Sequence, residues 1–341
     1  KGEACLAGLL RRTSVKALLA ERAALGRKDH PSRVVVFQHN NTVEHALATL
    51  QSNRILGAPV TLGASAEDHD AGTYMGIVDV GSIFFHLVRD YLAPHQDAKS
   101  EDLLAEDQAS FQKAVREFGK QLLITVMGED TGVILKAEED GNLEDLVANS
   151  FLGEGNTSRK ISYVHRTTLF NARGHIVGIL SQSDIVRFLY RHADPSHPVL
   201  QKSVKSVFGL KPVLTVEEGK SILFSLLKMY RNDCTSTIGI VDPEGRLSDA
   251  FSMSNLRSVT LGDIESFNVP IQNFTTLCHS AFLKKMKPRK IPAMDADSSV
   301  LSLLKLVVKR QIHHVYLVDK EEKPVGVVSL TDIIRTLIKN E

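Results

Sequence analysis

One twelve-residue segment occurs twice in this chain with few changes. Residues 178–189 read GILSQSDIVRFL and residues 326–337 read GVVSLTDIIRTL. In both copies an apolar run leads to Ser-x-Ser/Thr-Asp and then to a second apolar segment that contains an Arg. Such internal similarity indicates a chain built from copies of one small unit, and this constrains the fold more than any other feature.

The sequence before the second copy shows what the unit contains. Residues 297–311 open with Asp and Ser, which suit a helix N-cap, and then carry apolar residues at helical spacing. Residues 312–324 are an apolar run, an Asp-led polar turn and the start of another apolar run, which is typical of two paired strands. The unit therefore predicts helix, strand, turn, strand, helix over roughly 50 residues.

Three more copies of the unit divide the chain. We expect repeat 1 over residues 1–95, a linker over 96–120, repeat 2 over 121–197, repeat 3 over 198–265 and repeat 4 over 266–341. Two shorter echoes, TSVKALL at 13–19 and KSVKSVF at 202–208, each precede an odd-numbered repeat. The chain therefore divides into two similar halves. Near its start, we also expect an amphipathic helix over residues 15–25.

Composition and motifs narrow the class of function. The 341 residues carry a formal net charge of +1, so we expect no nucleic-acid partner and no membrane partner. The three cysteines have no metal-binding spacing and fit a reducing compartment, the cytoplasm or nucleus. We find no phosphate-binding loop, nucleophile elbow or dinucleotide fingerprint, so we predict a protein that is not an enzyme and has no metal site.

With VHR at 164–166 in the second repeat and IHH at 312–314 in the fourth, the chain resembles proteins with four CBS (cystathionine-β-synthase-type) domains. Among them it is most similar to the γ, energy-sensing subunit of AMP-activated and SNF-type protein kinases, in its plant and algal γ-like group. The resemblance implies an α/β fold of α+β repeats, in which four CBS domains form two Bateman modules within a pseudo-symmetric disk. It also implies AMP, ADP or ATP as a regulatory ligand, with no obligatory cofactor.

The resemblance assigns candidate residues to that nucleotide. Those matching the ribose and base contacts are Asp184, Ser181, Ser183, Asp332, Ser329 and Thr331, and those matching the phosphate contacts are His165, Arg166, His313 and His314. An ionised Asp can accept hydrogen bonds from both ribose hydroxyls. Arg suits phosphate, whereas neutral His binds it only weakly.

A purely structural interpretation stays open for these residues. An Asp in this position is a good helix cap without any ligand, and the His-Arg and His-His pairs would also suit a surface. In the odd repeats the Asp position is Ser82 or Asn255, neither of which reproduces the two-acceptor clamp. Animal γ subunits keep this Asp in their first, third and fourth repeats, so the pattern here differs.

Two functions fit these observations. The first is a regulatory adenine-nucleotide-binding protein that controls a partner, such as a SNF-type kinase with its catalytic and β subunits. The alternative is a structural scaffold in a larger assembly, with vestigial nucleotide sites.

Overall fold

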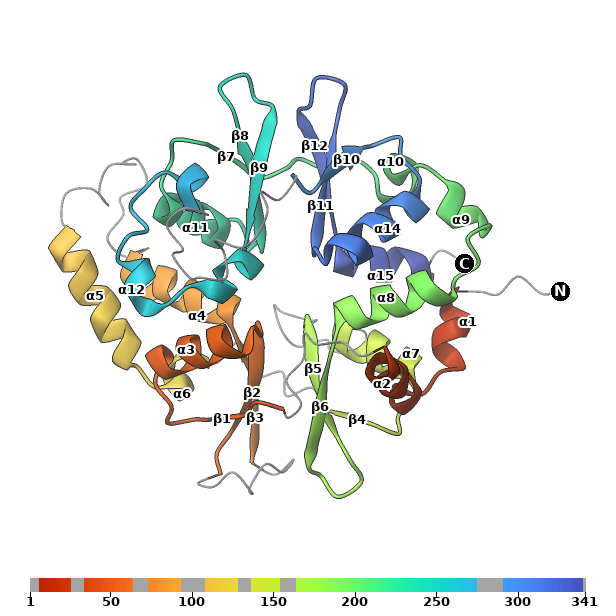
Figure 1. Cartoon of the computed structure of the whole chain (residues 1–341), viewed down its shortest axis with the longest axis horizontal. Coiled ribbons are helices and arrows are strands. Elements are labelled where there is room, and N and C mark those ends of the chain that lie inside the picture. Colours follow the sequence, from red (N-terminus) through yellow and green to blue (C-terminus); the bar gives the residue numbers. More distant parts are fainter. Residues whose placement is uncertain are drawn as a thin grey trace.

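The computed structural model describes residues 6–25, 34–63, 73–92, 108–127, 136–153, 164–274 and 291–339. Viewed down its shortest axis, the molecule has four small sheets near the middle and helices on the two outer sides (Figure 1). Each sheet has three strands, the first parallel to the second and the second antiparallel to the third. The predicted α/β fold of four repeats is confirmed.

Each repeat supplies one sheet and the helices on either side of its strand pair. Repeat 1 contains β1 (Phe37–Gln38), α3 (Val43–Asn53), β2 (Gly57–Thr61), β3 (Tyr74–Asp79), α4 (Val80–Leu87) and the π-helical turn η1 (Val88–Leu92). Repeat 2 contains β4 (Lys136–Glu138), α7 (Leu143–Leu146), the π-helical turn η4 (Val147–Phe151), β5 (Arg166–Phe170), β6 (Ile176–Ser181) and α8 (Gln182–His192). Repeat 3 contains β7 (Thr215–Glu217), α11 (Ile222–Arg231), β8 (Thr237–Val241), β9 (Leu247–Ser252) and the 3-10 helix η5 (Met253–Ser258). Repeat 4 contains β10 (Ala293–Asp295), α14 (Val300–Arg310), β11 (His314–Val318), β12 (Pro324–Ser329) and α15 (Leu330–Lys339).

The remaining helices precede or follow these sheet-forming segments in the sequence. They are α1 (Leu6–Arg11), α2 (Val15–Ala24), α5 (Gln108–Lys120), α6 (Leu123–Met127), α9 (Pro198–Gln201), α10 (Val204–Phe208), α12 (Leu261–Ile264) and the 3-10 helix η6 (Ile271–Asn273). Helix α5 falls in the stretch that we expected to be a linker. Helix α2 matches the helix expected over residues 15–25.

The two echoed segments pack on the even repeats, although each precedes an odd one in sequence. Ser14, at the start of α2, bridges to Asn142 of repeat 2, and Ser203, at the start of α10, bridges to Ser299 of repeat 4. The sequence similarity of the two segments therefore reflects equivalent positions in the two halves of the molecule.

Two hydrophobic cores hold the helices together, and each takes residues from both halves of the chain. One core joins repeats 1 and 3, with Leu50 and Leu226 among its fully buried members. The other joins repeats 2 and 4 and includes Ile185 and Leu303. In Figure 1 these cores underlie the helices on the left and right sides.

The sheets form the other two interfaces, between repeats 1 and 2 and between repeats 3 and 4. Thr168 of repeat 2 donates a hydrogen bond to the Tyr74 hydroxyl of repeat 1 at 2.9 Å. An equivalent buried pair, Thr237 and Tyr316, joins repeats 3 and 4, also at 2.9 Å. Burial raises the pKa of Tyr74 to about 12 and also raises that of Tyr316, so both phenols stay neutral.

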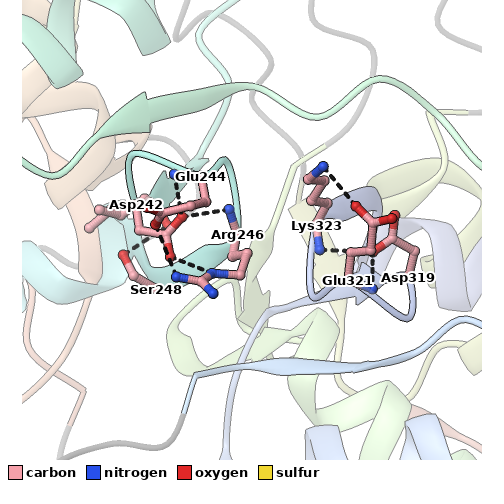
Figure 2. A network of polar contacts seen from close by, with 8 residues as sticks. Asp242, Glu244, Arg246, Ser248, Asp319, Glu321 and Lys323 are labelled. Atoms are coloured by element: carbon pink, nitrogen blue, oxygen red, sulfur yellow. Dashed lines mark hydrogen bonds and ion pairs between the residues drawn. The ribbon is translucent and has the colours of Figure 1, made fainter.

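In repeats 3 and 4, an Asp side chain closes the turn between the second and third strands of the sheet. Asp242 accepts hydrogen bonds from the backbone N–H groups of Glu244 and Arg246 at 3.1 and 2.8 Å, which closes the β8–β9 turn (Figure 2). Asp319 closes the β11–β12 turn in the same way, through the N–H groups of two later residues at 2.9 Å. The N–H of Leu247 donates to the carbonyl of Glu322 at 2.9 Å, so the two turns are joined directly.

Candidate functional site

The same hydrogen-bonded box closes the strand-to-helix junction in all four repeats. In repeat 4, Ser329 donates from its N–H and hydroxyl to Asp332 Oδ2 at 2.9 and 2.6 Å, and the Asp332 N–H donates back at 3.1 Å. In repeat 2, Ser181 makes the same two bonds to Asp184 Oδ2 at 3.0 and 2.7 Å. The odd repeats close their boxes with the pairs Asp79–Ser82 and Ser252–Asn255.

This box gives each Asp a structural role that needs no ligand. The first N–H groups of a helix lack partners within the helix, and a capping box satisfies them. Because Ser82 and Asn255 also close their boxes, the junction does not itself require Asp. A binding role for Asp184 or Asp332 must therefore rest on what else surrounds each carboxylate.

The two carboxylates have different surroundings. The side chain of Asp184 is only 3% exposed, and Arg22 Nη1 and Arg187 Nη1 lie 3.4 and 3.7 Å from its oxygens. Asp332 is half-buried, and its hydrogen bonds reach Oδ2. Among the described residues, no hydrogen-bond donor contacts its Oδ1. Asp332 therefore keeps acceptor capacity that Asp184 has already committed to arginines.

Two other predicted contact residues lie between repeats 2 and 4. Thr331 is buried and donates to Gln182 Oε1 of α8 at 3.1 Å. Ser183 lines a hollow of about 10 Å³ between α8 and the end of α14. That is room for about one water molecule, far below the roughly 300 Å³ or more of a ligand pocket.

The predicted phosphate contacts come together near the centre of the molecule. Arg166, at the start of β5, donates to Asp79 Oδ2 of repeat 1 at 3.1 Å. His314, at the start of β11, is hydrogen-bonded through Nε2 to the hydroxyl of Ser236 in repeat 3 at 3.0 Å. Each contact crosses from an even repeat to its odd partner.

The pKa values of the three histidines show that they share one environment. Burial lowers the pKa of His313 well below its usual value, and the charges of His314, Arg166, Arg257 and His165 lower it further. Burial also lowers the pKa of His314 to about 4, with His165 adding to this effect and Asp332 opposing it. All three histidines are therefore neutral at pH 7.

His165 has a lowered pKa for the same main reason. Burial lowers it, the charge of Asp79 opposes this, and Arg166 reinforces it. By accessible surface, however, His165 is exposed, and His313 and His314 are half-buried. The three side chains therefore keep contact with water although many protein atoms surround them.

These residues define a central cluster that all four repeats build. Its members are Asp79, His165, Arg166, Ser236, Arg257, His313, His314 and Asp332. Sequence reasoning selected Arg166, Asp332 and the histidines. No sequence motif marks Arg257 or Arg22, because the residues that each of them contacts are remote in sequence.

The ranges that the structure describes contain no group of three or more His, Cys, Asp or Glu side chains placed to hold a metal ion. Nor does any helix within those ranges combine the length and apolar character needed to cross a membrane.

Comparisons with known proteins agree with this architecture. The family model described as "CBS domain" matches residues 285–339. An Arabidopsis thaliana protein, "SNF1-related protein kinase regulatory subunit gamma-like PV42a", is 22% identical over 334 residues, covering 89% of this chain and 91% of its own length. The "5'-AMP-activated protein kinase subunit gamma" of Dictyostelium discoideum is also 22% identical, over 90% of this chain, which spans about half (50%) of that relative.

One solved structure has the same fold. It is a Methanocaldococcus jannaschii protein regarded as an archaeal homologue of γ-AMPK, with a TM-score of 0.62 and 13% identity. The match covers 90% of this chain and 98% of that chain. At this level of identity the likeness shows the fold alone.

Proposed function

We propose that this chain, a four-repeat CBS-domain protein that resembles the γ-like regulatory subunits of SNF1- and AMP-activated-type kinases, is a regulatory subunit that binds an adenine nucleotide. The observation that carries the proposal is the central cluster. Two arginines and three histidines from repeats 2, 3 and 4 act on one another there through their charges, and Asp332, the carboxylate with remaining acceptor capacity, acts on His314.

The chemistry of the cluster suits a phosphorylated nucleoside. Arg166 and Arg257 keep their charge at any physiological pH and can donate to phosphate oxygens. His165, His313 and His314 are neutral without a ligand, and a nearby phosphate would favour their charged forms. Asp332 would accept hydrogen bonds from ribose hydroxyls while its Oδ2 continues to cap α15.

A ligand at this position would act on the arrangement of repeats. It would contact several repeats at once, so its affinity would depend on how they are placed relative to one another. A partner that also favours one placement would then be coupled to the ligand, because coupling requires differential affinity for the two states. The proposed partners are the catalytic and β subunits of a SNF-type kinase, in the cytoplasm or nucleus, and no catalysis by this chain is proposed.

Calorimetric titration with AMP, ADP and ATP tests the binding. We expect saturable heat in the wild type and at least a roughly tenfold weaker affinity in Asp332→Asn, which is a loss of about 1.4 kcal/mol. Asn255 already closes the equivalent box in repeat 3, so the variant should remain folded. Asp319→Asn, in an exposed turn of the same repeat, is the matched control. Absence of heat and of any thermal shift at millimolar nucleotide would contradict the proposal.

A scaffold with vestigial sites remains the second candidate. Asp184 is ion-paired to arginines, and Ser82 and Asn255 replace the Asp in the odd repeats, so three of the four junctions lack a carboxylate available at this position. Co-purification with the kinase catalytic and β subunits, without any nucleotide binding, would support the scaffold over the sensor.

A further inference from the structure

Helix α2 places an arginine on the carboxylate of repeat 2, and repeat 4 has no counterpart among the described residues. Arg22 Nη1 lies 3.4 Å from Asp184 Oδ2, and Arg187 approaches the other oxygen from α8 at 3.7 Å. The side chains of Arg22 and Arg187 are 19% and 15% exposed, and that of Asp184 is 3% exposed. This is a largely buried group of two cations and one anion.

The fold holds Arg22 in this position from several sides. Its Nη1 also donates to the carbonyl of Ile179 in β6 at 2.9 Å. The preceding residue, Glu21, accepts hydrogen bonds from Arg191 Nε at 2.6 Å and His192 Nε2 at 3.0 Å, both on α8. Val15 and Leu18, on the same side of α2 as Arg22 by helical spacing, are buried in the core of repeats 2 and 4. Arg22 is therefore fixed by the packing of the whole helix.

Building on the proposed function, we infer that Arg22 fills the ribose position of repeat 2, so that the chain binds a nucleotide through Asp332 and none through Asp184. Ribose hydroxyls are neutral donors, so they cannot balance the buried charge of Asp184 as Arg22 and Arg187 do. A ribose that displaced Arg22 would also leave a buried cation without its partner, which is strongly unfavourable. The two twelve-residue segments are thus alike in sequence, but only the one that contains Asp332 binds a nucleotide.

The number of nucleotides bound tests this assignment. We expect one AMP per chain in the wild type, one of unchanged affinity in Asp184→Asn, and at least roughly tenfold weaker binding of that one AMP in Asp332→Asn. Both variants keep an amide that can close the capping box, as Asn255 does in repeat 3. Two AMP molecules per chain, or loss of the single one in a folded Asp184→Asn protein, would overturn the inference.

A double-mutant cycle tests the occupancy of Asp184 without any nucleotide. Arg22→Gln and Asp184→Asn should each lower the urea midpoint, and the double variant should lose clearly less than the sum, because one missing partner already removes the interaction. Lys16 and Asp140 make the control cycle: they also join α2 to repeat 2, at 3.3 Å, but their side chains are 65% and 63% exposed. Their effects should add, since exposed ion pairs contribute little.

The two measurements separate failure of this inference from failure of the proposed function. If the wild type binds no nucleotide while Arg22 and Asp184 couple, the proposed function fails and the occupancy of Asp184 by Arg22 stands. If the effects of Arg22→Gln and Asp184→Asn simply add, the inference is wrong, whatever the chain binds.

Discussion

Three neutral histidines at the centre of the molecule make its stability depend on pH. His314 has a pKa of about 4 in the folded protein and an ordinary value of 6.5, and those of His165 and His313 are also lowered. Between these values the unfolded chain binds more protons than the folded one. Stability must therefore rise with pH across this window and fall on acidification.

We predict that the free energy of unfolding decreases as pH is lowered from 7 to 5, measured by urea denaturation. His314→Gln should reduce this slope, because it removes one of the groups that the unfolded chain protonates. His175→Gln, on an exposed turn between β5 and β6, is the control and should leave the slope unchanged. Equal slopes in His314→Gln and the wild type would show that His314 does not carry this dependence.

At the scale of elements, one side chain links the end of α1 to the start of a helix in repeat 2. Asn142 Nδ2 donates to the carbonyl of Arg11 at 2.9 Å, and its Oδ1 accepts from the N–H of Glu144 at 2.7 Å as the cap of α7. One residue thus ends α1 and starts a helix of repeat 2.

We predict that Asn142→Ala lowers the stability of the protein by about 1–2 kcal/mol, the usual effect of losing an N-cap. Amide hydrogen exchange should become faster over residues 6–25, since the tie to Arg11 is lost as well. Ser52→Ala, at an exposed helix end in repeat 1, should change neither quantity. Unchanged exchange over residues 6–25 in Asn142→Ala would mean that the core contacts of α2 suffice.

The elements themselves were largely predictable from the sequence. Alternating apolar runs around an Asp-led turn predicted the strand pairs, and β11 and β12 lie where residues 312–324 indicated. Sequence periodicity cannot show which repeat a helix joins, so the packing of α2 on repeat 2 was not foreseen. The candidate residues were foreseen in part: Asp332 and Arg166 carry a motif, whereas Arg22 depends entirely on tertiary packing.

At the scale of the whole molecule, the four repeats form a ring in which sheet–sheet interfaces alternate with helical cores. Sheets connect repeats 1 with 2 and 3 with 4, and helical cores connect 1 with 3 and 2 with 4. Each half of the sequence therefore supplies only part of two cores. Removing one half leaves two large apolar helix faces exposed on the other.

We predict that a fragment of residues 198–341 does not exist as a folded monomer. It should self-associate to cover the faces that repeats 1 and 2 normally cover, because exposed apolar patches of this size drive association. Analytical ultracentrifugation of the fragment and of the full chain at equal concentrations measures this. A folded monomeric fragment would show that one pair of repeats is stable by itself.

The division of both cores between the two halves also governs how the chain matures during synthesis. When residue 197 leaves the ribosome, neither core is complete, and the last strand and helix of repeat 4 follow only after roughly another 140 residues. Because synthesis adds about 5–20 residues per second, the apolar helix faces of the first half stay exposed for about 7–30 seconds. The nascent first half is then a substrate for chaperones, and its protease resistance should appear only when α15 emerges.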